Sequence, residues 1–547
     1  MPIRRALLWC ATAALMAVTP PAHGERGPVV TAPIGTVEGQ VQGDLLVFRG
    51  LPYAQAPVGA ARWKPPQPVQ TWSGVRKATQ FGPACFQPPV PASNLYADDV
   101  GAMSEDCLSL NIWAPKTAHK APVFVWIHGG ALNIGASRLS IYDGSKLAHR
   151  GVVVVSINYR MGILGWLAHP GLSAESADGV SGNYGLLDQI EALRWVRNNI
   201  SAFGGDPSNV TIAGESAGGL SVMYLMVAPA ARGLFHKAIA ESAYMISTPE
   251  LKGDNHGHPS AESAGVDIMK KLGAADIAQL RAMDPGKLTN GAAGGGFGPF
   301  GAVDGKVLPT QLVEAFDRGE QAHVPLLVGS NSGEIRSLRY LAPPIPATAA
   351  AYESAIHERY GDLAGPFLKL YPSSSLEESV LATTRDALYS WTSQRLAIKQ
   401  TAVGQPAYLY FFDHGYPAMD QAGLHGFHAS ELPYVFGTAD RLSPNWPKPP
   451  KTAEEAALTD AIIGYWTSFA TTGHPRAEGA PDWQAYDSTG AYMHFRAGPE
   501  MSKGLLPGMY SFVEQVVCRR RAAGNQQWNW NVGLAATPLP PPAPGCS

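Results

Sequence analysis

Short apolar runs rich in β-branched residues recur along the chain, and stretches with a helical period separate them. Such runs fit strands that are buried on both faces of a sheet. The clearest helical pattern covers Gly185–Ile200, and Gly204-Gly205 follows it as a stop signal. Strands that alternate with helices over several hundred residues predict an α/β fold with an open, mostly parallel sheet. The strand candidates are Pro122–Ile127, Gly151–Ile157, Val210–Ala213, Ala238–Ala240, Pro325–Val328 and Ala407–Phe412.

The first 24 residues have the pattern of an export signal. Arg4 and Arg5 precede an apolar run, Ala6–Val18, and small residues follow up to Gly24. The run is too short to span a bilayer comfortably. We therefore expect residues 1–24 to be cleaved and the protein to be exported, to the periplasm or the medium, without a stable membrane anchor.

The rest of the chain is expected to form one domain over residues 25–522. Hydrophobic residues make up 45% of the 547 residues, enough for a substantial core. Residues 25 to about 75 are rich in Gly, Pro and Val, which predicts an initial β-meander. The Pro-rich tail, residues 523–547, is expected to be poorly ordered. The net charge of −3 provides no strong field for nucleic acid or an anionic membrane. Whether the protein is a monomer or a homodimer stays open.

Cysteine usage agrees with export. Without Cys10, which lies in the signal, an even number of cysteines remains. Neighbourhood in sequence suggests that Cys85 pairs with Cys107, and that Cys518 and Cys546 form a possible second bridge. The alternative is four buried thiols. No cysteine or histidine spacing suggests a metal site.

A serine in a G-x-S-x-G pattern is the strongest chemical signal. Gly214-Glu215-Ser216-Ala217-Gly218 follows a predicted strand and precedes a helix-compatible run. A serine on such a tight strand-to-helix turn has its hydroxyl exposed, and the small neighbours relieve crowding. The context predicts a nucleophile for acyl transfer.

A nucleophilic serine also needs a place for the oxyanion that develops on the substrate. Ile127-His128-Gly129-Gly130-Ala131 follows another predicted strand, much like the H-G-G-G motif of lipases and esterases. The backbone N–H groups of Gly130, Ala131 and Ala217 are the candidate donors. The alternative is that the two glycines only make a turn.

Longer motifs resemble the type-B carboxylesterase family, which includes carboxylesterases, cholinesterases and bile-salt-type lipases. The likeness runs from about residue 28 to 515. This resemblance implies an α/β-hydrolase fold, with a large, mostly parallel central sheet flanked by helices and an active-site gorge, and no cofactor. The motifs are Ser104–Asn111, Gly182–Gln189 and Phe203–Thr211, the last leading into the serine turn.

The resemblance also implies the partners of Ser216. Gly329-Ser330-Asn331-Ser332-Gly333-Glu334 fits the family's acid segment and selects Glu334, with Asp304 as the rival acid. The segment from Gly426 to Gly437 resembles the family's histidine motif and selects His428, with His425 as the competitor. A histidine base must be neutral, so activity should fall as the pH drops through about 6 to 7.

Substrate contacts are expected from three further regions. Cys85 and Cys107 match the family's first disulfide, whose loop overhangs the gorge and here contains Tyr96 but no tryptophan, which argues against choline esters. Phe297 and Phe300 stand in a glycine-rich acyl-pocket region. Glu215 and Ser242 resemble positions that hydrogen-bond near the triad, although Glu215 could equally be a carboxylate at the start of a helix.

These observations predict an exported serine carboxylesterase that hydrolyses uncharged, moderately hydrophobic small-molecule esters through an acyl-enzyme. An amidase, a carbamate hydrolase or a lipase-like enzyme on the same triad is the alternative. A non-catalytic binding protein of the same fold is the rival from another class, and it would commonly lack the serine or the histidine.

Overall fold

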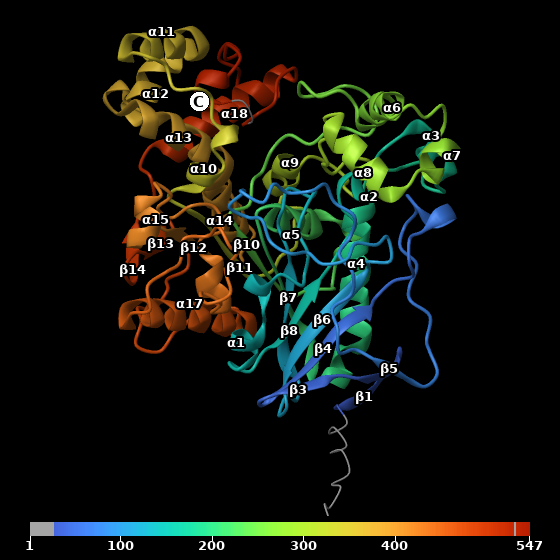
Figure 1. Cartoon of the computed structure of the whole chain (residues 1–547). Coiled ribbons are helices and arrows are strands. Elements are labelled where there is room, and N and C mark those ends of the chain that lie inside the picture. The colour runs from blue at the N-terminus through green and yellow to red at the C-terminus, as the bar shows by residue number, and fades with distance from the viewer. Residues whose placement is uncertain (1–26, 530–531, 547) are drawn as a thin grey trace, which may run out of the picture.

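A large twisted sheet runs through the computed structural model, which describes residues 27–529 and 532–546 (Figure 1). In these residues the sheet has eleven strands in the order β14-β13-β12-β11-β10-β9-β7-β8-β6-β4-β3. All neighbouring pairs from β13 to β8 are parallel, and the pairs at both ends are antiparallel. The predicted mostly parallel α/β sheet is therefore confirmed. The predicted export signal lies outside the described residues.

Each of the six predicted inner strands is present, with somewhat different ends. They are β7 (Ala121–Ile127), β8 (Val153–Ile157), β9 (Gly205–Glu215), β10 (Lys237–Glu241), β11 (Leu326–Asn331) and β12 (Ala407–Phe412). The sequence analysis did not propose the outer strands β6 (Ser109–Pro115), β13 (Ala491–Phe495) and β14 (Pro499–Lys503).

The predicted N-terminal β-meander is divided between two sheets. The strands concerned are β1 (Val29–Ala32), β2 (Gly35–Glu38), β3 (Gln40–Gln42), β4 (Leu45–Pro52) and β5 (Val75–Lys77). Strand β2 pairs with β1 on one side and with β5 on the other in a small three-stranded sheet of the described residues, whereas β3 and β4 extend the edge of the large one. Local composition predicts strands here but not this partition, because pairing depends on distant segments.

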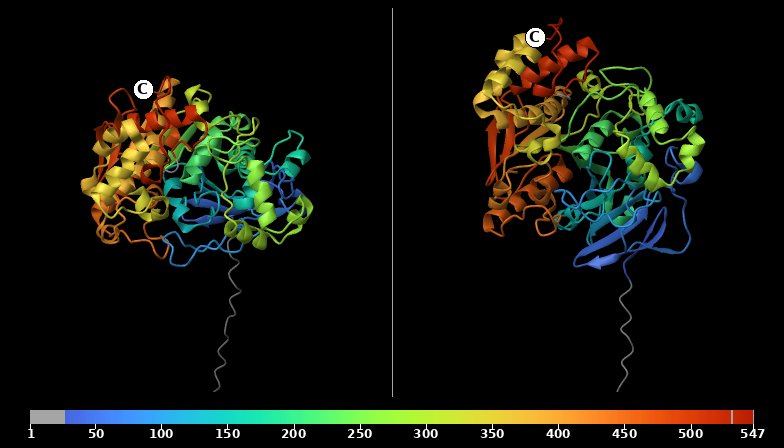
Figure 2. Two further views of the ribbon diagram at one scale, coloured as in Figure 1. Left: turned by 90° about the horizontal axis from the view of Figure 1, so that it is seen from above. Right: turned by 45° about the horizontal axis from the view of Figure 1, so that its top comes forward.

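Alternate residues of the inner strands bury against different helices. Val123, Val125 and Ile127 of β7 belong to one apolar core, while Phe124 and Trp126 belong to another. Helices α4, α5 and α14 pack on the first face, and α1, α16 and α17 pack on the second. Helices therefore cover both faces, as Figure 2 shows from two further directions. This is why β8, β10, β11 and β12 are buried at every position.

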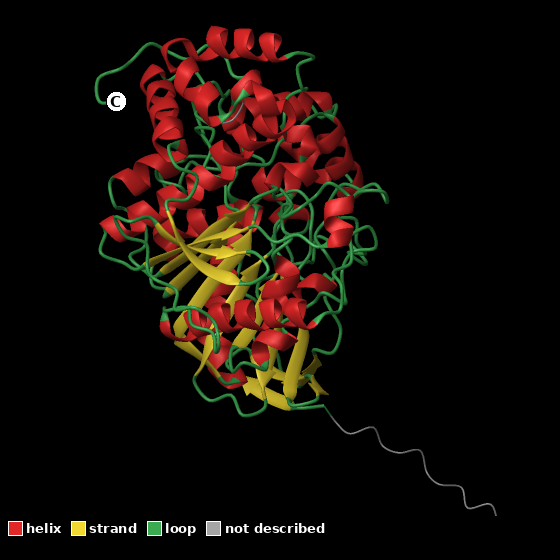
Figure 3. Cartoon of the chain, turned by 90° about the vertical axis from the view of Figure 1, so that its left-hand side faces the viewer, coloured by secondary structure: helices red, strands yellow, loops and turns green. Residues whose placement is uncertain are grey.

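The helices vary from one turn to five. Those that pack on the sheet are α1 (Ser145–Ala148), α4 (Tyr184–Asn199), α5 (Ala217–Val227), α14 (Trp391–Ala402), α16 (Leu432–Phe436) and α17 (Ala453–Thr472). The remainder are α2 (Gly162–Trp166), α3 (Pro170–Glu175), α6 (Ala261–Lys271), α7 (Ile277–Ala282), α8 (Pro285–Gly294), α9 (Leu312–Asp317), α10 (Glu334–Ser337), α11 (Ala349–Tyr360), α12 (Ala364–Leu370), α13 (Leu376–Arg385), α15 (Pro417–Gln421) and α18 (Met509–Ala523). Figure 3 shows helices gathered above one end of the sheet. No helix of the described residues combines the length and apolarity that crossing a membrane requires.

The described part of the C-terminal tail packs against the domain, which corrects the expectation of poor order. Trp528 is fully buried, and Asn529 donates its side-chain amide to the carbonyl oxygens of Met245 and Ala387. A disulfide joins Cys518 of α18 to Cys546. The Pro-rich composition thus reflects an extended segment that follows the surface, not an unstructured one.

Candidate active site

Ser216 occupies a sharp turn between the end of β9 and the start of α5. Its backbone has φ 58° and ψ −121°, and its N–H donates to the carbonyl oxygen of Glu241 at 2.9 Å. A side chain is rarely held in this conformation, which costs about 1–3 kcal/mol. A Cβ at Gly218 would lie 2.0 Å from the carbonyl oxygen of Ile127, so only glycine fits there. This is the turn that the sequence pattern predicts.

His428 and Glu334 are in direct contact. Nδ1 of His428 lies 2.5 Å from Oε2 of Glu334, whose side chain is fully buried. The other carboxylate oxygen accepts the N–H of Asn331 at 2.8 Å, which fixes the carboxyl group. With a carboxylate at Nδ1, the ring holds its proton there and leaves the lone pair on Nε2, the form that a general base needs.

Four parallel strands bring these groups to one edge of the sheet. Ser216 follows β9, Glu334 follows β11, and His428 lies on the long connection after β12. The glycine loop Gly129–Ala131 follows β7. Since the carboxyl ends of parallel strands lie at the same edge, residues far apart in sequence can converge there, where α/β proteins bind ligands.

The glycine loop passes directly beside the serine. A Cβ at Gly129 would lie 3.2 Å from the Cβ of Ser216, and Gly130 and Ala131 have φ 105° and φ 55°. Ala217 is the first residue of α5, where backbone N–H groups have no partner within the helix. These positions suit donors to an oxyanion on a substrate held at Ser216.

His128 supports the glycine loop from beneath. Its Nδ1 lies 2.8 Å from the carbonyl oxygen of Gly129, and Tyr159 donates its hydroxyl to the carbonyl oxygen of His128 at 2.8 Å. Burial lowers the pKa of His128 to about 4, so the ring is neutral at ordinary pH. His128 therefore contributes no positive charge to the site.

A cavity of about 430 Å³ opens onto Ser216 and His428. Its wall is largely aromatic and aliphatic, and it includes Gly129, Gly130 and Ala131. The ionisable groups other than tyrosine on the described wall are Asp98, Glu215 and His428, with no lysine or arginine. The aromatic members are Tyr96, Tyr142, Tyr244, Phe300, Tyr340, Tyr389 and Trp446.

The predicted pocket residues divide on this wall. Tyr96, Phe300 and Glu215 line the cavity. Phe297 does not, and the expectation for it was wrong: the residue packs against a separate apolar cluster with Phe86. Two phenylalanines only three residues apart thus belong to different surroundings, and the sequence spacing alone does not reveal this.

Glu215 lies close to the catalytic candidates and does not act as a helix-start carboxylate. Its Oε1 is 3.0 Å from Nε2 of His428, and its side chain is buried. Burial, with added repulsion from Glu334 and Glu241, raises the pKa of Glu215 well above its usual range. Ser242 follows β10 with φ 43°, and its side chain is also buried.

The two rival residues have structural partners elsewhere. Asp304 accepts the side-chain amide of Asn183 at 2.9 Å and three backbone N–H groups of its own turn. His425 lies between Asp420 and Asp413, with ring nitrogens at 2.7 Å and 3.3 Å from their carboxylates. Neither residue lines the cavity.

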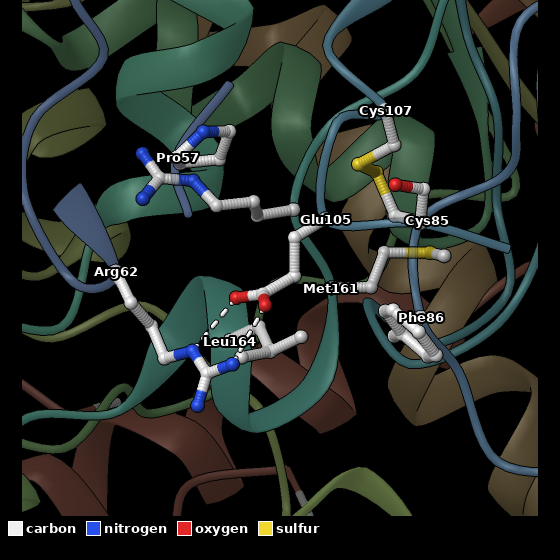
Figure 4. A pocket seen from close by; sticks show the side chains of 10 residues that line it. Pro57, Arg62, Cys85, Phe86, Glu105, Cys107, Met161 and Leu164 are labelled. Carbon is white, nitrogen blue, oxygen red and sulfur yellow. Dashed lines mark hydrogen bonds and ion pairs between the residues drawn. A yellow bond between two sulfur atoms is a disulfide. The ribbon is translucent and has the colours of Figure 1, made fainter. Parts of the chain in front are cut away.

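The loop between Cys85 and Cys107 covers one side of the site. The two Cα atoms are 5.0 Å apart across the disulfide. Figure 4 shows the Arg62 guanidinium facing the Glu105 carboxylate near this bond, with paired hydrogen bonds of 2.7 Å and 2.6 Å. A disulfide and a two-bond ion pair thus fix the base of the loop that carries Tyr96.

Sequence reasoning missed the aromatic residues that surround His428. The ring of Tyr389 lies 5.2 Å from the imidazole ring. Tyr389 belongs to a π-helical turn, Asp386–Ser390, between α13 and α14. Such turns often occur at functional sites, but no motif in the sequence marks this one.

Comparisons with known proteins agree with this geometry. The sequence model of the carboxylesterase family matches residues 26–513. The chain is 38% identical over 471 residues to a para-nitrobenzyl esterase of Bacillus subtilis (strain 168), covering 84% of this chain and 92% of that protein. It is 36% identical over 490 residues to a fumonisin B1 esterase of Sphingopyxis macrogoltabida, covering 86% and 87%. A solved PNB esterase superposes with a TM-score of 0.76 at 35% identity, covering 88% of this chain and 99% of that one.

Proposed function

Because the chain belongs to the carboxylesterase family and is a carboxylic ester hydrolase, we propose that it acts through Ser216, His428 and Glu334. The observation that carries the proposal is the contact between His428 Nδ1 and Glu334, on a histidine that shares one cavity with Ser216. Serine-based acyl transfer requires an acid that orients the base and a base that accepts the proton of the nucleophile.

In the proposed reaction, the Ser216 hydroxyl oxygen attacks the ester carbonyl carbon while Nε2 of His428 takes the hydroxyl proton. The carbonyl oxygen becomes an oxyanion and accepts hydrogen bonds from the N–H groups of Gly130, Ala131 and Ala217. One such donor is worth about 3 kcal/mol in the transition state. Glu334 stabilises the imidazolium that forms.

The intermediate then collapses. The bond from the carbonyl carbon to the alcohol oxygen breaks, His428 returns its proton to the leaving alcohol, and the acyl group stays on Ser216. A water molecule then hydrolyses the acyl-enzyme. His428 takes a proton from the water, and the water oxygen attacks the acyl carbon. The bond from the acyl carbon to the Ser216 oxygen breaks, that oxygen takes the proton from His428, and the carboxylic acid leaves. The overall change is hydrolysis of one ester bond, and the enzyme is regenerated.

The proposed substrates are uncharged, moderately hydrophobic esters. The largely apolar cavity of about 430 Å³ has room for a drug-sized molecule. Its described wall carries Asp98 and Glu215 but no cationic side chain, so an acyl or alcohol group that bears a carboxylate would lack a partner. This charge pattern favours neutral esters over anionic ones.

We also propose that the protein is exported. Two disulfides, Cys85–Cys107 and Cys518–Cys546, favour an oxidising compartment. The proposed cleavage follows residue 24. Mass spectrometry of the mature protein from its native host tests this, since an intact Met1 on the exported form would contradict it.

The test of the proposed function is kcat/KM for p-nitrophenyl esters from acetate to palmitate, with Ser216→Ala as control. We expect Ser216-dependent hydrolysis with a maximum at short to medium acyl chains. A maximum at palmitate would favour a lipase-like enzyme, and faster cleavage of a matched anilide or carbamate would favour the amidase or carbamate alternative. No Ser216-dependent activity in a folded sample would contradict the proposal.

A further inference from the structure

One tyrosine of the disulfide loop reaches across the site to the backbone of the catalytic histidine. The Tyr96 hydroxyl oxygen lies 2.8 Å from the carbonyl oxygen of His428 and 2.7 Å from Oγ of Ser337. These partners are 332 and 241 residues away in the sequence. The contacts therefore exist only because the fold brings three segments together.

The chemistry of the groups assigns the protons. A phenol carries one proton, and a carbonyl oxygen can only accept, so Tyr96 donates to His428. The Ser337 hydroxyl then donates to the Tyr96 oxygen, which completes a chain from Ser337 through Tyr96 to His428. Burial raises the pKa of Tyr96 well above its usual range, so the phenol stays protonated and able to donate at any working pH.

Ser337 connects this chain to the acid. It is the last residue of α10 (Glu334–Ser337), the short helix that begins with Glu334. A single hydroxyl is thus bonded both to the helix that carries the acid and to the backbone of the base. The contact of 2.5 Å between Glu334 and His428 depends on the relative position of these two segments.

Independent contacts hold Tyr96 in place. Its ring packs edge-on against Trp446 at 5.9 Å, and Trp446 packs on Phe427, which precedes His428, at 4.7 Å. Asn445 donates its side-chain amide to the carbonyl oxygens of Ala92 and Asn94 at 2.6 Å and 2.8 Å. The tip of the disulfide loop is consequently tied to the segment that follows the histidine.

We propose that Tyr96 is a positioning residue that fixes His428 relative to Glu334 through its shared hydroxyl. This inference rests on the proposed function, since it assumes that the two residues are base and orienting acid. It gives the disulfide loop a role in aligning the triad in addition to covering the cavity.

The test is Tyr96→Phe, which removes the hydroxyl and keeps the ring against Trp446. A lost neutral hydrogen bond predicts a fall in kcat of about threefold to tenfold on p-nitrophenyl butyrate, with KM changed less than about twofold because the apolar wall is kept. A looser contact with Glu334 stabilises the imidazolium less. The acid limb of kcat/KM should therefore shift to lower pH, an effect that a purely structural role would not produce.

The matched control is Tyr352→Phe. Tyr352 of α11 is buried, whereas Tyr96 is half-buried, but the Tyr352 hydroxyl likewise donates to a backbone carbonyl oxygen, that of Tyr371, at 3.0 Å. It lies away from the cavity, so its loss should lower stability comparably and leave kcat and the pH profile unchanged. Ser337→Ala provides a second variant, with a smaller loss of kcat in the same direction.

Wild-type kcat and pH profile in Tyr96→Phe would overturn the inference, even if its melting temperature falls. If Tyr96→Phe does not fold, Ser337→Ala decides: an unchanged kcat and pH profile overturns the inference. Failure of the proposed function is distinguishable, because the wild-type protein would then show no Ser216-dependent hydrolysis at all.

Discussion

Glu215 Oε1 lies 3.0 Å from Nε2 of His428, on the ring nitrogen opposite the one that Glu334 contacts. Burial and the neighbouring carboxylates Glu334 and Glu241 raise the pKa of Glu215, so this group resists ionisation. An imidazolium formed during catalysis would favour its ionised form. In the proposed mechanism, Glu215, the residue before Ser216, would therefore add a negative charge beside His428 only when the imidazolium forms.

Glu215→Gln should accordingly lower kcat by about tenfold with little change in KM, because the amide keeps the shape but cannot carry the charge. Steady-state kinetics on p-nitrophenyl butyrate measures this. An unchanged kcat would show that the carboxyl group acts only by filling space, and a changed KM alone would assign it to substrate binding.

Glu334→Gln separates the acid from its rival. The glutamine amide either holds the His428 imidazole in the wrong tautomer or fails to stabilise the imidazolium, because it carries no negative charge. We therefore expect kcat to fall by about a thousandfold or more. His425→Gln and Asp304→Asn should each keep kcat within about threefold, since their side chains lie outside the cavity. A large loss in Asp304→Asn, with the fold retained, would contradict the assignment of Glu334.

The charge of the cavity wall predicts discrimination against anionic esters. The p-nitrophenyl ester of succinic acid should have a kcat/KM at least about tenfold below that of the butyrate ester, since its free carboxylate meets Asp98 and no lysine or arginine on the described wall. Asp98→Arg should reduce the ratio of kcat/KM for the butyrate ester to kcat/KM for the succinate ester. The control is Asp99→Arg, because Asp99 is exposed and does not line the cavity. An equal reduction of this ratio in both variants would contradict the role of Asp98 on the wall and indicate a long-range effect of the added charge.

Glu241 predicts a pH-dependent cost to stability. Burial raises the pKa of Glu241 to about 8, although its carboxylate accepts the indole N–H of Trp466 at 2.9 Å. In the unfolded chain the group ionises near pH 4.5. Between about pH 4.5 and 8 the unfolded state has lost this proton and the folded state keeps it, so stability falls as the pH rises through this window.

Glu241→Gln removes that titration. The free energy of unfolding of the variant minus that of the wild type should increase from pH 5 to pH 8 by about 2 kcal/mol or more, since each pKa unit is worth about 1.4 kcal/mol. Melting temperatures of both proteins at each pH measure this difference. Glu478→Gln, at an exposed position, should show no such trend. A constant difference between variant and wild type across this range would contradict the raised pKa.

The sequence predicts the inner strands and the candidate triad because both depend on local signals. The runs that become β7 to β12 are mostly apolar, since helices cover both faces of the sheet, and their few polar residues, such as Ser156 and Thr211, are buried too. Ser216 lies in a turn whose two glycines, Gly214 and Gly218, are required because a Cβ there would lie 2.5 Å and 2.0 Å from neighbouring backbone atoms. Each of these features can therefore be recognised from a few consecutive residues.

Other features depend on contacts between distant segments and leave no local mark. Phe297 and Phe300 look equivalent in sequence, yet only Phe300 lines the cavity. Tyr389 approaches His428 through a π-helical turn that has no composition signal. The Pro-rich tail appeared unstructured because its order comes from burial of Trp528 and from the disulfide at Cys546.

The most direct test of the central claim is the intact mass of the protein after reaction with a fluorophosphonate, followed by peptide mapping. The account predicts one phosphonyl group on Ser216, none in Ser216→Ala, and labelling at least about a hundredfold slower in His428→Ala. A folded wild-type protein that takes no label, or a label that persists in Ser216→Ala, would contradict it.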